Sequence, residues 1–132
     1  MKIRVYYEDT DAGGVVYHAN YLKFCERARS ELFFERGLSP EIDGGHFVVS
    51  QIEASFHSPA KLGDMLIVKN TIIDIKGASL RLKQEIFKED KKLFSITSTL
   101  VFVNGGKPCR LKPHTKALLD ELFRDQKGQE AF

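Results

Sequence analysis

The amino-acid sequence predicts a single α+β domain, in which an antiparallel five-stranded sheet wraps around one long central helix and a second helix follows. The length of 132 residues, with 42% hydrophobic and 29% charged residues, is typical of one globular domain spanning residues 1–132. A stretch with helical periodicity lies near the N-terminus. Four β-rich segments, separated by regular turn signals, come after it.

The first two predicted elements are a short strand and the long helix. Residues 2–8 alternate in polarity and are rich in β-forming residues, which predicts a strand. Residues 15–36 contain no Gly or Pro and carry one apolar face at helical spacing, with His18 in the opening turn. The inward-facing residues would be Tyr17, Tyr21, Phe24, Cys25, Ala28 and Leu32. Gly37 and Pro40 would end this helix of about 18 residues, which is roughly 27 Å long.

An antiparallel meander and a closing helix complete the prediction. The four strands are residues 48–56, 65–75, 79–88 and 93–103. They are separated by the turn sequences S-P-A-K-L-G-D, K-G-A and E-D-K-K, and N-G-G ends the last one. A helix over residues 114–127 would turn Ala117, Leu118, Leu122 and, at its margin, Leu119 inward. Residues 128–132 carry no pattern, and we expect them to be flexible.

Charge and composition exclude several classes of protein. A formal net charge of +2 gives no general reason to expect a nucleic-acid partner. The N-terminus lacks the apolar core of a signal peptide, and the longest uncharged apolar run falls short of the ~20 residues that span a bilayer. Cys25 and Cys109 lie far apart and form no C-x-x-C motif. We therefore expect a cytoplasmic protein with free thiols and no transmembrane segment.

The most informative segment is residues 6–21, Y-Y-E-D-T-D-A-G-G-V-V-Y-H-A-N-Y. Two carboxylates and a double glycine stand directly before the predicted helix, whose first N–H groups have no intrahelical partner. Gly13 and Gly14 allow a tight turn and a close approach of the backbone to a ligand. From the residues alone, Asp11 is either a capping or Asx-turn residue or a reactive carboxylate whose ionised form the helix N-terminus favours, and Asp9 would be a turn or capping residue. This segment indicates an enzyme that binds and attacks a polar carbonyl.

Other kinds of catalytic site find little support in the sequence. Cys25 lies in the apolar stripe, too far along the helix from His18 to form a thiolate–imidazole pair. No serine stands in a G-x-S-x-G motif, and the four histidines lack the spacing of metal ligands. We therefore expect no metal ion.

The motif D-T-D-A-G-G-V-V-Y-H-A-N-Y closely resembles that of the hot-dog-fold acyl-CoA thioesterases. The resemblance is to the 4-hydroxybenzoyl-CoA thioesterase family and, within it, to the bacterial subgroup associated with the Tol-Pal system. It extends over nearly the whole chain, because F-H-S-P-A-K-L-G-D resembles the family's second recurrent segment. It implies a hot-dog fold and hydrolysis of a short-chain, aromatic or fatty acyl-CoA to the free acid and CoA.

The resemblance also implies roles for individual residues. Asp11 would be the nucleophile or general base, and the main-chain N–H of His18 would polarise the thioester carbonyl while its imidazole orients substrate or water. Four further positions, Tyr7, Gly14, Val15 and Tyr17, would line the substrate site. No cofactor is implied, since coenzyme A is part of the substrate.

Binding of coenzyme A would need cations for its phosphates. Candidates are Lys61, Arg81 and Lys83, with Lys107, Arg110 and Lys112 as further choices. The resemblance implies a homodimer or homotetramer, with residues 48–56 and Pro59 contributing across the interface. Membrane-associated protein partners are also implied by the Tol-Pal subgroup.

Alternative functions remain open at the level of sequence. The same fold acts on acyl groups carried by acyl-carrier protein, and it supports dehydratases, although these usually use a differently placed His. A non-catalytic module that binds acyl groups or proteins of the Tol-Pal system is the alternative from another class.

Overall fold

The computed structural model describes residues 1–124. The elements, in chain order, are β1 (Lys2–Arg4), the single 3₁₀ turn η1 (Tyr7–Asp9), α1 (Asn20–Phe34), β2 (His46–Phe56), β3 (Met65–Ile75), β4 (Ser79–Lys88), β5 (Lys91–Asn104), β6 (Lys107–Pro108) and α2 (Pro113–Arg124). The five predicted strands are all present, and the two-residue β6 is an addition. The expected end of α2 at residue 127 and the expected flexibility of residues 128–132 fall outside the described residues.

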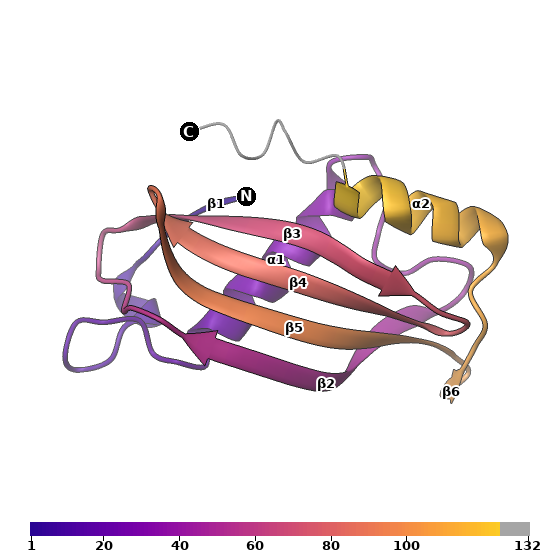
Figure 1. Cartoon of the computed structure of the whole chain (residues 1–132), viewed down its shortest axis with the longest axis horizontal. Helices are drawn as coiled ribbons and strands as arrows, with labels where there is room; N and C mark the ends of the chain where they lie inside the picture. Colours follow the sequence, from indigo (N-terminus) through magenta and orange to yellow (C-terminus); the bar gives the residue numbers. More distant parts are fainter. Residues whose placement is uncertain (125–132) are drawn as a thin grey trace.

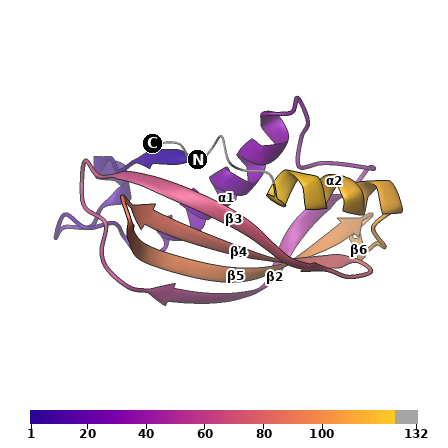
Figure 2. The same cartoon turned by 45° about the horizontal axis from the view of Figure 1, so that its top comes forward.

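All strands pair antiparallel in one sheet, in the order β1-β3-β4-β5-β2, with β6 beside β5. The sheet curves around α1, which crosses behind the strands in Figure 1. Figure 2 shows that α1 and α2 lie on the same side of the sheet, so within residues 1–124 no helix covers its opposite face. This is the hot-dog arrangement that the resemblance implies. None of the helices within residues 1–124 has the length and apolar character needed to cross a membrane.

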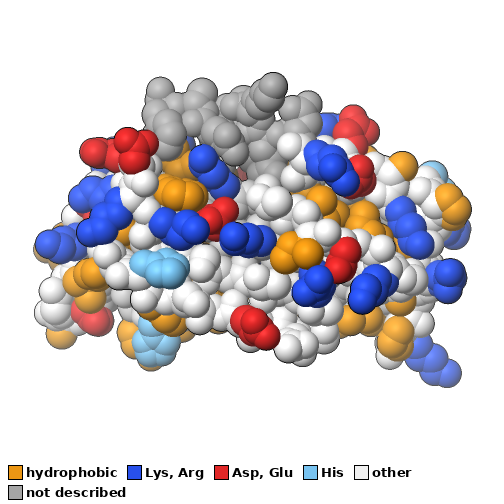
Figure 3. Space-filling model, in the orientation of Figure 1, with side chains coloured by type: hydrophobic (Ala, Val, Ile, Leu, Met, Phe, Trp, Pro, Cys, Tyr) orange, Lys and Arg blue, Asp and Glu red, His pale blue; other side chains and the backbone are white. Residues whose placement is uncertain are grey.

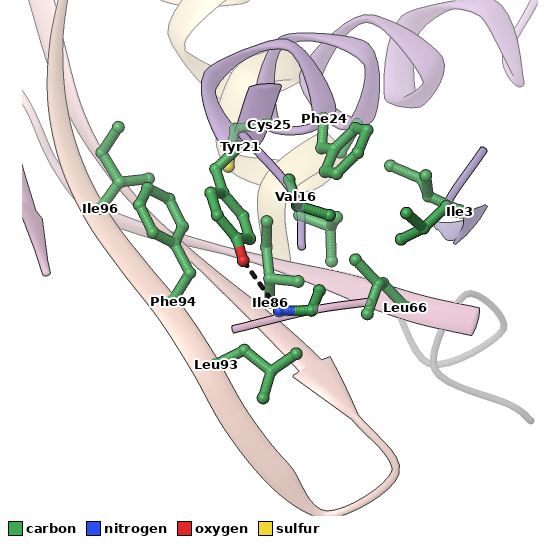
Figure 4. Close-up of a cluster of buried hydrophobic side chains, with 14 residues drawn as sticks. Ile3, Val16, Tyr21, Phe24, Cys25, Leu66, Ile86, Leu93, Phe94 and Ile96 are labelled. Carbon is green, nitrogen blue, oxygen red and sulfur yellow. Dashed lines mark hydrogen bonds between the residues drawn. The ribbon is translucent and has the colours of Figure 1, made fainter. Parts of the chain in front are cut away.

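The apolar stripe of α1 packs into the concave face of the sheet. Tyr21, Phe24, Cys25, Ala28 and Leu32 are all buried, as predicted. Figure 4 shows the cluster at the N-terminal half of the helix, where the Tyr21 ring stacks on Phe94 with ring centroids 4.9 Å apart. A second cluster joins the C-terminal half of α1 to α2 and β4. Burial of one helical face against the sheet fixes the position of both ends of α1.

The predicted first strand is too long. Strand β1 ends at Arg4, and the chain turns through η1, because the Asp9 carboxylate accepts a hydrogen bond from the Tyr6 N–H at 2.9 Å. The Asp9 N–H also donates to the Tyr6 carbonyl at 3.0 Å. An aspartate side chain that accepts a hydrogen bond from a nearby backbone N–H competes with strand pairing. Here it favours the turn η1 over a longer strand β1.

The predicted helix begins too early. Val15 and Val16 are extended and pair with other segments of the chain, so α1 starts only at Asn20. His18 therefore precedes the helix instead of lying in its opening turn. Tyr17, predicted to face inward, is 48% exposed for the same reason. In α2, Leu119 and Leu122 are buried as predicted, whereas Leu118 is only partly buried and Ala117 is exposed.

Strand β2 forms one edge of the sheet. Among the described strands it pairs with β5 alone, and ten of its eleven residues are exposed. Among them, four large apolar side chains are each at least 40% exposed: Val48, Val49, Ile52 and Phe56. A long edge strand with exposed apolar side chains is able to pair with another chain.

Candidate active site

The loop before α1 is a tight turn built from the double-glycine motif. The Asp11 N–H donates to the Val15 carbonyl at 2.9 Å, and the Gly14 N–H donates to the Asp11 carbonyl at 3.1 Å. Gly14 has a φ of +79°, in the left-handed region that non-glycine residues rarely adopt. The loop therefore needs a glycine at this position for its conformation.

The segment F-H-S-P-A-K-L-G-D, residues 56–64, holds this loop in place. The Val16 N–H donates to the Ala60 carbonyl at 2.8 Å, and the Leu62 N–H donates to the Gly14 carbonyl at 3.3 Å. The Tyr21 hydroxyl accepts a hydrogen bond from the Ala60 N–H at 3.0 Å, drawn as a dashed line in Figure 4. Burial raises the pKa of Tyr21, which keeps this hydroxyl neutral. The two motifs thus form one unit at the N-terminal end of α1.

The two aspartates of the motif have different environments. Asp9 is 4% exposed, and its carboxylate accepts hydrogen bonds from the Tyr6 N–H and, at 3.0 Å, from the Asn20 side chain. Asp11 is exposed, and its Oδ1 accepts a hydrogen bond from the Gly13 N–H at 2.8 Å. Within residues 1–124 its Oδ2 makes no hydrogen bond. Asp9 is therefore structural, as predicted, and Asp11 keeps a carboxylate oxygen available for chemistry.

His18 lies between this loop and the helix and presents two groups. Its ring is exposed and lies against Tyr17, with ring centroids 4.4 Å apart. Its main-chain N–H makes no hydrogen bond within the described part of the chain. By contrast, the Tyr17 N–H donates to the Asp9 carbonyl, and the Asn20 N–H donates to the Tyr17 carbonyl. A free N–H of this kind is the donor that a developing oxyanion requires.

A cleft of about 270 Å³, here called the His18 cleft, opens beside these residues. It is lined by Val16, His18, Tyr21, Phe56, His57, Ser58 and Pro59. Sequence reasoning assigned only His18 and Pro59 to substrate binding or catalysis. Phe56, His57 and Ser58 could have been found from the sequence, because they open the F-H-S-P-A-K-L-G-D segment. Asp11 and Tyr7 do not line the cleft, and both are exposed, Tyr7 at 82%. Asp11 lies on the loop that residues 60–62 hold, and Tyr7 lies just before that loop.

A second hollow of about 420 Å³, here called the Lys61 groove, adjoins the His18 cleft through Ser58 and Pro59, which line both. Lys61, Lys88 and Lys91 all line it, and the sequence analysis selected only the first. Lys88 forms an ion pair with Asp64 at 2.9 Å. Burial alone would raise the pKa of Asp64, but hydrogen bonds from Lys88 and from the Lys61 N–H lower it below its ordinary value. The groove thus carries an excess of positive charge.

The other two predicted phosphate ligands, Arg81 and Lys83, lie elsewhere. They stand on β4 and point to the face of the sheet turned away from α1, where Figure 3 shows many Lys and Arg side chains. Arg81 donates two hydrogen bonds to Asp74, at 2.7 and 3.1 Å. Lys83 lies 3.9 Å from Glu85. The structure therefore does not bring these residues together with Lys61.

Two other kinds of chemistry receive no support from the geometry. Burial raises the pKa of the Cys25 thiol to about 12, so it is not ionised near neutral pH and cannot act as a nucleophile. Within residues 1–124, no three His, Cys, Asp or Glu side chains lie together as a metal site would require.

Comparison with known proteins finds thioesterases both by sequence and by structure. The family model described as the thioesterase superfamily matches residues 13–95, a range that begins two residues after Asp11 and includes His18, Pro59 and Lys61. The chain is 53% identical over 87 residues to the acyl-CoA thioesterase YbgC of Helicobacter pylori. That match spans 66% of this chain and 65% of the relative, slightly less than two thirds of its length. The acyl-CoA thioester hydrolase YbgC of Escherichia coli O157:H7 is 40% identical over 114 residues, which cover 84% of each chain.

Solved structures show the same fold. A crystal structure of a probable thioesterase from Bartonella henselae superimposes with a TM-score of 0.79 at 36% identity, covering 85% of this chain and 97% of that one. A thioesterase from Thermus thermophilus, crystallised with coenzyme A and Zn, gives a TM-score of 0.78 at 26% identity and covers 97% of this chain and 93% of its own. From its fold, its loop and these matches, the chain belongs to the thioesterase superfamily.

Proposed function

We propose that this protein hydrolyses acyl-CoA thioesters to a free acid and coenzyme A. The observations that carry the proposal are an exposed carboxylate with an unbonded oxygen, Asp11, and an unbonded main-chain N–H, that of His18, both in the segment that leads into α1. Membership of the thioesterase superfamily and the names of the YbgC relatives support the same activity.

The groups of the site suit the chemistry of thioester cleavage. Asp11 acts either as the nucleophile, forming an anhydride that water then hydrolyses, or as the general base that removes a proton from the attacking water. In both routes a new C–O bond replaces the C–S bond, and coenzyme A leaves as a thiolate that is then protonated. The His18 N–H stabilises the charge that develops on the carbonyl oxygen, and its imidazole orients the substrate or water.

The remaining predicted residues are assigned to substrate contacts. Gly14 and Val15 form the backbone that approaches the thioester, and Tyr7 and Tyr17 supply exposed rings beside it. Pro59 borders both the His18 cleft and the Lys61 groove, so a pantetheine arm lying over it would bring the phosphates to Lys61. Arg81 and Lys83 are less suitable for this role, because both are engaged by carboxylates on the far face of the sheet.

Measurement of free-thiol release tests the function. A panel of short aliphatic, long aliphatic and 4-hydroxybenzoyl esters of coenzyme A is offered to the wild-type protein, and we expect turnover of at least one. The same acyl groups on acyl-carrier protein form a second arm, and faster turnover there would replace coenzyme A by the carrier protein. Absence of turnover in both arms would overturn the proposal and favour a non-catalytic binding module.

We also propose that two copies pair through their β2 edges to form a homodimer, the unit from which a tetramer would be built. The exposed apolar side chains of this unpaired edge support the proposal. Pairing would place residues 48–56 of one protomer beside the same strand of the other. The His18 cleft, which includes Phe56 at the end of β2, would then lie next to the interface.

The substitution Ile52→Lys tests this interface, because it places a charge on the edge of β2. We expect light scattering to give twice the 15.0 kDa protomer mass, or a multiple of it, for the wild type and the single protomer mass for the variant. Ile73→Lys is the matched control, since Ile73 is 42% exposed and Ile52 is 43% exposed, but Ile73 lies on β3, which β4 and β5 separate from β2. Equal masses for Ile52→Lys and the wild type would exclude a β2 interface.

A further inference from the structure

A cleft of about 290 Å³, here called the Arg29 cleft, lies between the C-terminal half of α1, α2 and the sheet. Arg29 is nine residues beyond the start of α1, which places it about 14 Å along the helix axis from the end that carries Asp11 and His18. The walls are mostly apolar and include Phe33, Leu100 and Leu119. Its volume is near the lower end of small-molecule sites, ~300–1,000 Å³, so its ligand would be small.

Arg29 is held in this cleft by a buried hydrogen-bond network. Its Nη1 donates to the Oε1 of Gln84 at 3.2 Å. Gln84 is fully buried, and its amide nitrogen donates to the Cys25 carbonyl at 2.8 Å and to Asn70 Oδ1 at 2.6 Å. These two bonds fix the orientation of the amide, so its oxygen is the atom turned towards Arg29. The guanidinium is therefore positioned by the core and is not a freely moving surface group.

The network leaves most of the guanidinium unsatisfied by protein. Arginine has five N–H donors, and Gln84 is the acceptor found for this side chain within residues 1–124. No carboxylate of those residues lies within ion-pair distance of it. Burial lowers the pKa of Arg29, yet an arginine remains charged at neutral pH. The nearby Glu26 favours the charged form but makes no ion pair with Arg29, so this partly buried cation lacks a direct anionic contact, which an anionic ligand would supply.

We propose that the Arg29 cleft binds a small carboxylic acid, with the carboxylate on the Arg29 guanidinium and the apolar body against Phe33, Leu100 and Leu119. A planar carboxylate fits the two-pronged guanidinium, and a single cation balances its single charge. A phosphate dianion fits less well, because Arg29 is the one Lys or Arg side chain of residues 1–124 that lines the cleft, beside Ser30 and His46. No described residue lines both this cleft and the His18 cleft, and His46, Phe47 and Val49 of β2 make the Arg29 cleft border the proposed dimer interface.

Among residues 1–124, Glu26 is the one acidic side chain that lines the cleft, and it predicts an effect opposite to that of Arg29. It lies one turn before Arg29 on α1 and is exposed. A bound carboxylate would be repelled by it, because like charges at short range disfavour each other. Glu26→Gln should therefore tighten binding of the acid, whereas removal of the Arg29 charge should weaken it.

Titration calorimetry with octanoate, and with 1-octanol as a ligand of the same chain length without charge, tests the proposal. We expect the wild type to bind octanoate about tenfold or more tightly than octanol, which corresponds to a hydrogen bond between charged groups. Similar affinity for the two ligands, or no saturable binding of octanoate, would overturn the proposal. This comparison needs no variant and no turnover, so its result is independent of the proposed thioesterase activity.

Variants then locate the site, since a free acid is also the product of the proposed reaction and would fit the catalytic cleft. Arg29→Met should weaken octanoate binding about tenfold or more and leave octanol binding unchanged. Arg27→Met, which removes an exposed arginine that does not line the cleft, is the matched control and should bind octanoate as the wild type does. Unchanged octanoate binding by Arg29→Met, or weaker binding by Glu26→Gln, would refute the assignment.

Discussion

Replacement of Asp11 by Asn is expected to lower kcat for the best acyl-CoA ester by about 10²–10⁴-fold, the range associated with loss of a general acid or base. An amide has nearly the shape of the carboxylate, but it neither attacks a thioester nor accepts a proton from water. The effect would be larger still if Asp11 is the nucleophile, because no covalent intermediate could then form.

The same substitution should leave the fold almost unchanged. Asp11 is exposed, and the hydrogen bond that its Oδ1 accepts from the Gly13 N–H remains available to the amide oxygen of Asn. We expect a change in unfolding free energy within about 0.5 kcal/mol, as is usual for surface sites. Glu8→Gln removes another exposed carboxylate of the same segment and should retain full activity. Thiol release by folded Asp11→Asn within tenfold of the wild type would disprove the assigned role.

The fold was largely predictable because its main elements follow simple periodicities. The stripe of Phe24, Cys25, Ala28 and Leu32 fixes one face of α1, and the bounds of β3 and β4 agree with the predicted strands. Predictions failed where side chains bond to the backbone locally. Asp9 ends the first strand early through its bond to Tyr6, and no propensity of residues 6–8 indicates that bond.

The roles of Asp11, Gly14 and His18 stay predictions from the motif, whereas the surroundings of these residues could not be predicted from the sequence. The pairing of Val16 with Ala60 depends on a contact between segments more than forty residues apart. The same limit explains why Arg81 and Lys83 were grouped with Lys61, since a strand face is readable from sequence but the side of the sheet it occupies is not. The Gln84 network around Arg29 likewise joins residues that only the folded chain brings together.

Removal of the Asp9 carboxylate is the prediction with the largest expected effect on stability. Asp9→Ala would leave two donors without partners beside a buried position, the Tyr6 N–H and the Asn20 side chain. Each unsatisfied group costs about 1–3 kcal/mol, so we expect a loss of roughly 2–4 kcal/mol in unfolding free energy. Thermal unfolding followed by circular dichroism should show Tm falling by about 10 °C for a chain of this size.

Asp9→Asn and Asp11→Asn form a pair that makes the same chemical change two residues apart, and their effects should be opposite. In Asp9→Asn, one carboxylate oxygen that accepts a hydrogen bond becomes an NH₂ donor, which faces either the Tyr6 N–H or the Asn20 side-chain amide. Stability therefore falls, although less than in Asp9→Ala. At position 11 stability is retained and catalysis is lost. Because a dimer makes Tm depend on concentration, all variants are compared at one protein concentration. If Asp9→Ala unfolded at the wild-type temperature, the buried carboxylate would not be what holds the start of α1 against the loop that carries Asp11.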